Sequence, residues 1–402
     1  MTLASGFAGC HIVLGVSGGI AAYKSVELLR LLTKMGADVR IVMTRNATRF
    51  VGPVTFEALS GRKVCMDLFN HGDDAAIGHI EWAKAADAVV IAPATANIIG
   101  KLAGGIADDA LSTFMLAVTA PVLICPAMNT HMLAHPAVMH NLEMLRSFGH
   151  RVLMPGAGEL ACGTTGPGRL PDPADILDRL LAHLTTKDLA GKRILVTAGP
   201  TQEAIDPVRF ISNPSTGKMG YALARAAEHR GAAVTLVSGP THLTAPLNVE
   251  SVPVTSAHQM AAAVYERLER VDVVIKAAAV SDYRPTTAAD QKIKKGPAEM
   301  VMTLEKNPDI LATLGQRKTH QILVGFAAET QQLTDHAAEK LVQKNLDMIV
   351  ANRIGPADTG FGADTNQVVL LCRDGGRETL ALMPKPQLAH LILDRIVAML
   401  AA

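Results

Sequence analysis

The sequence predicts two tandem α/β domains, each with a mainly parallel sheet between two layers of helices. One observation is that apolar runs of strand length alternate with segments of helical spacing along most of the chain. Another is that a strand, a glycine turn and a helix open the chain at His11–Val16 and Ser17–Gly19, and the same order begins again at Ile194–Val196 and Gly199. The length of 402 residues also favours two domains of ordinary size.

The composition narrows the class of protein. Hydrophobic residues make up 49% of the chain and charged residues 19%, as in a globular protein with a large core. A net charge of +1 and an aromatic content of 3% give no support for a nucleic-acid or membrane-surface partner. The five cysteines form no CxxC pair, which favours free thiols and no zinc framework. With no leader pattern and no apolar run of about 18 residues, we expect a cytoplasmic protein.

The first domain is expected to span residues 1–183. Its predicted strands are His11–Val16, Asp38–Met43, Ala88–Ala94, Ala120–Met128 and Arg151–Pro155, and a helix is predicted over Ile20–Lys34. These strands are apolar on both faces, which is typical of a parallel sheet covered on each side. We therefore expect a flavodoxin-like or Rossmann-like three-layer domain.

A polar stretch at residues 184–192 is the predicted linker, and the second domain is expected over 193–402. There the alternation of strands and helices continues, and two final strands flank Asp374–Gly376 as an antiparallel hairpin before a last helix. The pattern breaks at residues 281–304, which are polar and basic. Such an insertion beside a strand end is typical of a lid or clamp.

Small and hydroxyl residues follow two strands of the first domain. Gly15, Ser17, Gly18 and Gly19 lie at the first strand-to-helix turn, and Thr95 and Asn97 follow the strand that ends at Ala94. Helix N-terminal amides at such turns bind phosphates, and a cofactor site at the point where strand order reverses would use both segments. Tight packing and ordinary helix capping explain the same residues equally well, so both interpretations stay open.

Three further residues of the first half have side chains suited to catalysis. His79 begins a predicted helix, Asn129 follows a strand end, and Cys162 lies in a glycine-rich loop. The alternatives are a capping or surface histidine, a turn-forming asparagine and an inert thiol.

Four segments of the first half together resemble the flavin-dependent phosphopantothenoylcysteine decarboxylases: GVSGGIAAYK, HIEWAKAADAVVIAPATAN, PAMNTHM and ACGTTGPGR. The resemblance implies that His79 and Asn129 are active-site residues and that Cys162 is the proton donor. It implies FMN binding by Gly15, Ser17, Gly18, Gly19, Thr95, Asn97 and Met128. Loss of carbon dioxide beside an amide needs an electron sink, which oxidation of the substrate's CH₂–SH group by a bound flavin would supply, and an acid must then return one proton.

The second half contains STGKMG at residues 215–220, which lacks the GxxxxGK[ST] order of a P-loop. A Rossmann-like loop that binds phosphates through backbone amides and Lys218 stays open. Lys292, Lys340 and Lys344 would suit a triphosphate, although a solvated basic face explains their spacing as well.

Five segments of the second half resemble the CTP-using bacterial phosphopantothenate–cysteine ligases: TAGPTQEAIDPVRFISNPSTGKMG, AAAVSDYRP, KIKK, LEKNPDIL and VGFAAET. The resemblance implies Asn213 at an acyl intermediate and Lys292 on the triphosphate. It implies CTP contacts from Lys276, Ala277, Ala278, Asp282, Pro308, Asp309, Ile310, Leu311, Phe326, Lys340 and Lys344. The phosphopantothenate carboxylate would attack the α-phosphate of CTP, and the cysteine amine would attack the acyl cytidylate, with Mg²⁺ balancing the triphosphate charge.

The whole chain therefore resembles the bifunctional coenzyme A biosynthesis proteins, in which the product of the second half is the substrate of the first. The resemblance implies a homo-oligomer in which trimers of flavin domains and dimers of ligase domains build a dodecamer. Two rival interpretations differ in class. The first half could be a flavin-binding regulatory module without decarboxylase activity, and the second a nicotinamide-dependent reductase, although it lacks GxGxxG.

Overall fold

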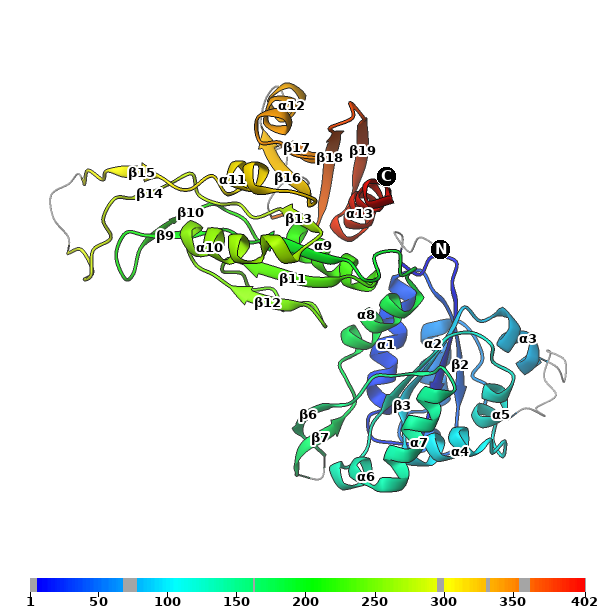
Figure 1. Ribbon diagram of the computed structural model, residues 1–402. Helices are drawn as coiled ribbons and strands as arrows, with labels where there is room; N and C mark the ends of the chain where they lie inside the picture. Colours follow the sequence, from blue (N-terminus) through cyan, green and yellow to red (C-terminus); the bar gives the residue numbers. More distant parts are fainter. Residues whose placement is uncertain are drawn as a thin grey trace. The chain divides into compact units, whose positions relative to one another are not determined.

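The structure is a computed structural model, and it describes residues 6–67, 78–161, 163–294, 300–329, 333–353 and 362–401. The chain divides into two compact units, Met1–Thr185 and Thr186–Ala402. Each unit contains its own sheet (Figure 1). Each unit also has its own pair of apolar cores.

The first unit is built on a five-stranded parallel sheet. Its strands are β1 (His11–Val16), β2 (Asp38–Met43), β3 (Ala88–Ala94), β4 (Val122–Pro126) and β5 (Arg151–Val152). They lie in the order β2-β1-β3-β4-β5. This is the flavodoxin-like order. Successive strands are added on one side of β1 and then on the other, so the strand order reverses between β1 and β3. The predicted parallel sheet and fold class are confirmed for this unit.

Helices cover both faces of this sheet because its strands are apolar on both sides. Ile12 and Leu14 of β1 belong to one core, whereas Val13 between them belongs to the other. The helical segments are α1 (Ala22–Lys34), the 3₁₀ helix Ala47–Arg49, α2 (Pro53–Ser60), α3 (Gly78–Ala85), α4 (Ala96–Gly104), α5 (Ala110–Leu116), α6 (Thr130–Ala134), α7 (Pro136–Ser147) and α8 (Pro173–Leu184). A hairpin of β6 (Gly156–Glu159) and β7 (Thr165–Arg169) stands apart from the main sheet.

The second unit is built on an eight-stranded sheet. Its strands are β8 (Arg193–Ala198), β11 (Ala233–Ser238), β12 (Glu250–Pro253), β13 (Val273–Lys276), β16 (Ile322–Glu329), β17 (Met348–Arg353), β18 (Thr365–Cys372) and β19 (Arg377–Pro384). The order is β12-β11-β8-β13-β16-β17-β18-β19, parallel up to β17 and antiparallel beyond it. The six parallel strands have the Rossmann order, and the predicted hairpin at the end of the sheet is confirmed.

Side chains of β8 again alternate between two cores, with Ile194 and Val196 in one and Leu195 in the other. The helical segments are α9 (Lys218–His229), α10 (Ala257–Arg267), the 3₁₀ helix Leu268–Arg270, α11 (Ile310–Arg317), α12 (Leu333–Gln343) and α13 (Lys385–Ala401). Two small pairs of strands extend from this body: β9 (Gln202–Ala204) with β10 (Phe210–Ser212), and β14 (Tyr283–Pro285) with β15 (Leu304–Lys306). The pair β14–β15 forms the two ends of the predicted insertion at 281–304, of which residues 295–299 lie outside the described residues.

In both units the strand order reverses beside the first strand, so the carboxyl ends of β1 and β3, and of β8 and β13, border a natural binding site. Among the helices that the structure describes, none combines the length and the apolar character needed to cross a membrane.

Candidate active sites

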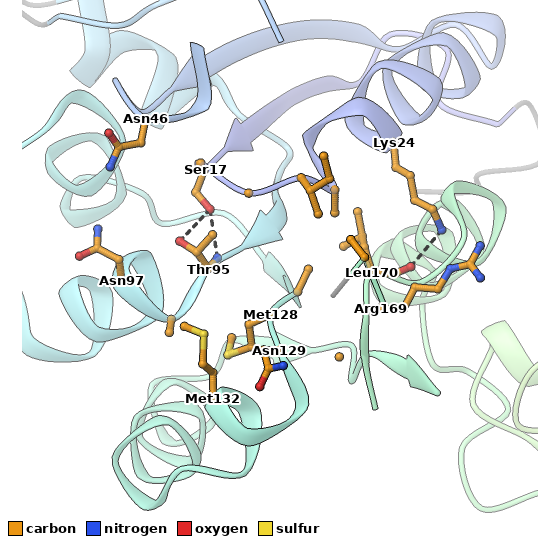
Figure 2. A pocket seen from close by; sticks show the side chains of 18 of the residues that line it. Ser17, Lys24, Asn46, Thr95, Asn97, Met128, Asn129, Met132, Arg169 and Leu170 are labelled. Carbon is orange, nitrogen blue, oxygen red and sulfur yellow. Dashed lines mark hydrogen bonds between the residues drawn. The ribbon is translucent and has the colours of Figure 1, made fainter. Parts of the chain in front are cut away.

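The first unit contains a cavity of about 810 Å³ at the carboxyl ends of β1, β3 and β4 (Figure 2). Residues from the glycine turn, the start of α4 and the segment after β4 line it, and the hairpin β6–β7 closes one side. This volume is typical of a site for a cofactor or small substrate.

Ser17 joins the two strand ends that border this cavity. Its hydroxyl donates to the Pro93 carbonyl at 2.7 Å and accepts a hydrogen bond from the Thr95 backbone N–H at 3.0 Å. The two hydroxyls of Ser17 and Thr95 are also hydrogen-bonded, at 3.1 Å (Figure 2). Ser17 thereby fixes the turn after β1 to the start of α4.

The N-terminus of α4 is suited to an anion. Its N-cap residue, Thr95, makes no side-chain hydrogen bond to the helix, so the first-turn N–H groups have no cap from that side chain. The glycine turn also approaches the neighbouring segment closely. A Cβ atom on Gly18 would lie 2.5 Å from the Asn46 Cβ and 2.7 Å from its carbonyl carbon, so only glycine fits there.

Lys24 on α1 is a buried residue of this cavity that the sequence analysis did not identify. Its side chain is 7% exposed, and Nζ donates to the Leu170 carbonyl at 3.1 Å (Figure 2). The same Nζ also donates to an Asp172 carboxylate oxygen at 2.8 Å. The ion pair with Lys24 holds the pKa of Asp172 below its usual range. Lys24 therefore ties α1 to the segment that follows hairpin β6–β7.

Lys101 on α4 is a second lining residue without a signal in the sequence. Its ammonium lies 2.6 Å from carboxylate oxygens of both Asp108 and Asp109, which raises the pKa of Lys101. Asp109 is also the N-cap of α5, where it forms a capping box with Ser112. The pairing fixes the loop between α4 and α5.

Seven of the predicted first-half residues line the cavity: Ser17, Gly18, Gly19, Thr95, Asn97, Met128 and Asn129. Gly15 lies inside β1, where a Cβ atom would meet the Leu111 side chain at 2.8 Å, and it does not reach the cavity. His79 is the second residue of α3, and its side chain lies outside the described part of the chain. Cys162 also lies outside the described residues.

The second unit contains a cavity of about 720 Å³, bordered by the carboxyl ends of β13, β16 and β17 and by the N-termini of α9 and α11. All of the predicted second-half residues except Lys292 line it: Asn213, Lys276, Ala277, Ala278, Asp282, Pro308, Asp309, Ile310, Leu311, Phe326, Lys340 and Lys344. Lys292 is exposed in the insertion between β14 and β15 and does not belong to this cavity.

One part of this cavity is strongly basic. Lys276 ends β13, and both burial and the positive charge of Lys344 lower its pKa to about 8. Lys340 also lowers it, whereas Asp309 acts in the opposite direction. Asp309 caps α11 through the Ala312 N–H at 3.0 Å and pairs with Lys344 at 2.8 Å. Three lysines beside one carboxylate favour an anionic ligand that carries several charges.

Lys218, which the sequence analysis left open as a phosphate ligand, also lines this cavity. Three polar residues beside it were not identified from the sequence: Asn352, Asn366 and Lys385. Lys385 is 4% exposed and donates to the Ala363 carbonyl at 2.6 Å, and Lys218 pairs with Asp364 at 2.6 Å. The two asparagines, on β17 and β18, are buried. No motif in the sequence around them marks these side chains as part of a cavity.

Within the described residues, no group of three or more His, Cys, Asp or Glu side chains is arranged to hold a metal ion.

The comparisons with known proteins cover both units. The family model described as Flavoprotein matches residues 6–185, and the model described as DNA/pantothenate metabolism flavoprotein C-terminal domain matches residues 189–400. The coenzyme A biosynthesis bifunctional protein CoaBC of Bacillus subtilis (strain 168) is 49% identical over 393 residues, which are 97% of each chain. The CoaBC protein of Escherichia coli (strain K12) is 48% identical over 395 residues, again 97% of each chain.

A crystal structure of the C-terminal domain of a CoaBC protein covers 54% of this chain and 99% of its own, with 48% sequence identity and a TM-score of 0.47. The identity to the full-length relatives confirms the resemblance that the motifs of both halves predicted. The chain belongs to the family of bifunctional coenzyme A biosynthesis proteins.

Proposed function

We propose that the second unit joins cysteine to 4′-phosphopantothenate with CTP, and that the first unit decarboxylates the product to 4′-phosphopantetheine. The observation that carries this proposal is the lining of the second cavity. Residues from six separate segments line it, and the family resemblance implies that each contacts CTP or the acyl intermediate. Membership of the bifunctional family supports the pairing of the two activities in one chain.

In the ligase reaction, Lys276, Lys340 and Lys344 would neutralise the triphosphate while the phosphopantothenate carboxylate attacks the α-phosphate and pyrophosphate leaves. Asn213 would orient the resulting acyl cytidylate for attack by the cysteine amine, which forms the amide and releases CMP. We expect Mg²⁺ to enter with the triphosphate, whose charge it balances.

The first cavity fits FMN in size and chemistry. The N-terminal amides of α4, which the Thr95 side chain does not cap, suit a phosphate, and the glycine turn lines the cavity beside them. Ser17, Gly18, Gly19, Thr95, Asn97 and Met128 would hold the cofactor, and Gly15 would act only by packing beneath the turn. The bound flavin supplies the redox chemistry that makes loss of carbon dioxide possible. Asn129 would orient the substrate, His79 would act at the same site, and Cys162 would return the proton.

Three further parts complete the proposal. The enzyme would act in the cytoplasm, because the cysteines that the structure describes are free thiols and a reducing compartment keeps thiols free. It would assemble as a dodecamer in which flavin-domain trimers are linked by ligase-domain dimers. Lys292 would contact the triphosphate.

The test is to incubate the purified chain with 4′-phosphopantothenate, cysteine, CTP and Mg²⁺ and to follow the masses of the pantothenate species. We expect a yellow protein that forms phosphopantetheine, pyrophosphate and carbon dioxide. A reaction that stops at the cysteine adduct would instead support a flavin-binding regulatory role for the first unit.

A Cys162→Ser variant tests the proton donor separately. It should still release carbon dioxide but accumulate an oxidised enethiol. Full turnover of this variant to the saturated thiol would contradict the role of Cys162.

A further inference from the structure

The turn between β9 and β10 contains a carboxylate that is fully buried. The Asp206 side chain is 0% exposed, and its Oδ1 accepts the backbone N–H groups of Val208 and Arg209, both at 2.8 Å. Its Oδ2 accepts the Arg209 guanidinium through Nε at 2.9 Å and Nη2 at 2.5 Å. The hydrogen bonds from Arg209 and from backbone N–H groups hold the pKa of Asp206 far below its usual range, so this carboxylate is charged at any ordinary pH.

The same ion pair reaches across to the insertion and holds one peptide segment from both sides. Asp206 Oδ2 accepts the Ile293 backbone N–H at 3.1 Å, and Arg209 Nη2 donates to the Ile293 carbonyl at 2.8 Å. We call this arrangement the Ile293 clamp. A side-chain pair that satisfies both polar groups of one residue fixes the backbone there much as a strand partner would.

The clamp is the main attachment of this part of the insertion. Residues 287–294 contain no helix or strand. Among the described residues, their hydrogen bonds to the rest of the chain are the two of the clamp and one from the Ala289 N–H to the Ile205 carbonyl at 2.9 Å. All three bonds therefore end on the β9–β10 turn.

The residue next to the clamped peptide is Lys292. Its side chain is exposed, and no ion pair holds its ammonium within the described part of the chain. The backbone of Lys292 is thus fixed while its charge stays available. The other end of the same hairpin leads directly into Asn213, so one short element carries both the clamp and a residue of the second cavity.

We propose that Asp206 and Arg209 are positioning residues of the ligase reaction, which fix the backbone beside Lys292 and leave its side chain able to reach the triphosphate. The inference rests on the proposed function, because that function assigns the triphosphate to Lys292 as its ligand. A misplacement of about 1 Å in a charged group can slow a reaction by about 100-fold, so an ion pair that only fixes a backbone segment has a measurable effect on rate.

The test uses Asp206→Asn in the full-length chain, because asparagine has one acceptor oxygen and cannot replace both carboxylate oxygens, which bind the β9–β10 turn on one side and Arg209 and Ile293 on the other. The rate of pyrophosphate release from CTP is measured with 4′-phosphopantothenate and Mg²⁺ but without cysteine. We expect kcat/KM for CTP to fall by roughly 10- to 100-fold. Decarboxylation of added phosphopantothenoylcysteine by the same sample, together with its thermal unfolding, shows that the chain is intact. Glu378→Gln, which breaks another Arg–carboxylate pair of this unit at Arg395, is the matched control and should keep the wild-type rate.

A double-mutant cycle separates positioning from general destabilisation. If the clamp acts through Lys292, Asp206→Asn should change the rate of a Lys292→Gln chain by less than roughly twofold. An equal loss in both backgrounds, or a wild-type rate for Asp206→Asn, would overturn the inference.

Arg209→Lys provides a second test if Asp206→Asn does not fold, because a single ammonium cannot reproduce the fork that bonds Asp206 and the Ile293 carbonyl together. A wild-type chain that releases no pyrophosphate would remove the proposed function, and this inference with it.

Discussion

Asn213 and Lys276 bind successive carbonyl groups of one segment. Asn213 Nδ2 donates to the Ala279 carbonyl and Lys276 Nζ donates to the Ala278 carbonyl, each at 3.2 Å. Asn213 follows β10 and Lys276 ends β13, so two elements far apart in the chain meet on the strand end that lines the second cavity. The segment after β13 therefore fixes both side chains at the site.

Replacing Asn213 with aspartate should impair the ligase reaction. The variant keeps the shape of the side chain but loses the Nδ2 donor and places a negative charge beside the Ala279 carbonyl. We expect the rate of amide formation to fall about 100-fold, the usual effect of removing one positioned donor. A coupled pyrophosphate assay measures this loss, and decarboxylation of added phosphopantothenoylcysteine should not change. The exposed Asn248, changed to aspartate in the same way, serves as the control.

The lowered pKa of Lys276 predicts how CTP binding depends on pH. Burial and the charge of Lys344 bring this pKa to about 8, so the ammonium loses its proton as the pH rises through that value. Because the triphosphate binds the protonated form, we expect the Kd for CTP to rise up to about tenfold per pH unit above 8. Calorimetric titrations between pH 7 and 9.5 measure this slope. A Lys276→Met chain should bind CTP more weakly and show little change over that range, and an equally steep slope in it would assign the titration to another group.

The lowered pKa of Lys276 also affects the stability of the ligand-free protein, which should increase as the pH rises. The ordinary pKa of this lysine is 10.5, so between about pH 8 and 10.5 the unfolded chain binds more protons at Lys276 than the folded chain. This group alone then makes the second unit more stable as the pH rises across that interval. Denaturant titrations of the wild type and of Lys276→Met should differ in slope there.

Lys24 should contribute to the stability of the first unit. Lys24→Met removes the donor for the Leu170 carbonyl and for Asp172. We expect a loss of about 1–3 kcal/mol in the free energy of unfolding, because a buried polar contact is broken. Lys34→Met changes an exposed lysine at the end of the same helix and should cost almost nothing. Equal melting temperatures for the two variants would contradict the structural role of Lys24.

Arg230 should stabilise the second unit, as Lys24 stabilises the first. Its side chain is 4% exposed and pairs with Asp188 at 2.6 Å and Asp394 at 2.7 Å, so it joins the start of the unit to α13. Arg230→Met should lower the free energy of unfolding by about 3 kcal/mol, because it leaves two partly buried carboxylates without their partner. Arg395→Met, which breaks an exposed pair with Glu378, should cost at most about 1 kcal/mol. Chemical denaturation of the full chain measures both.

The sequence predicted the two main sheets because their strands have simple physical signals. Runs such as Ala88–Ala94 are apolar on both faces, and every residue of β3 is buried. The small hairpins were not predicted. β6 and β7 are rich in glycine and mostly exposed, and β9 and β10 have three residues each, so neither pair shows the alternation that identifies a strand.

The site residues also divide into those that the sequence predicted and those that it did not. Those in recognisable motifs, such as Asn129 and Asp309, line the cavities as expected. Lys24, Asn352 and Lys385 were missed because tertiary contacts alone bring them to their cavities. Lys24, for example, depends on a carbonyl that lies 146 residues away in the chain. Gly15 was included among the cofactor residues because it adjoins the glycine turn, but the structure assigns it to the strand before the turn.

The Ile293 clamp bears on how freely the sequence of the insertion can drift during evolution. The ion pair recognises the N–H and the carbonyl of residue 293 and makes no use of its side chain. Almost any amino acid at this position therefore satisfies the clamp. Proline is the exception, because it has no N–H to offer Asp206.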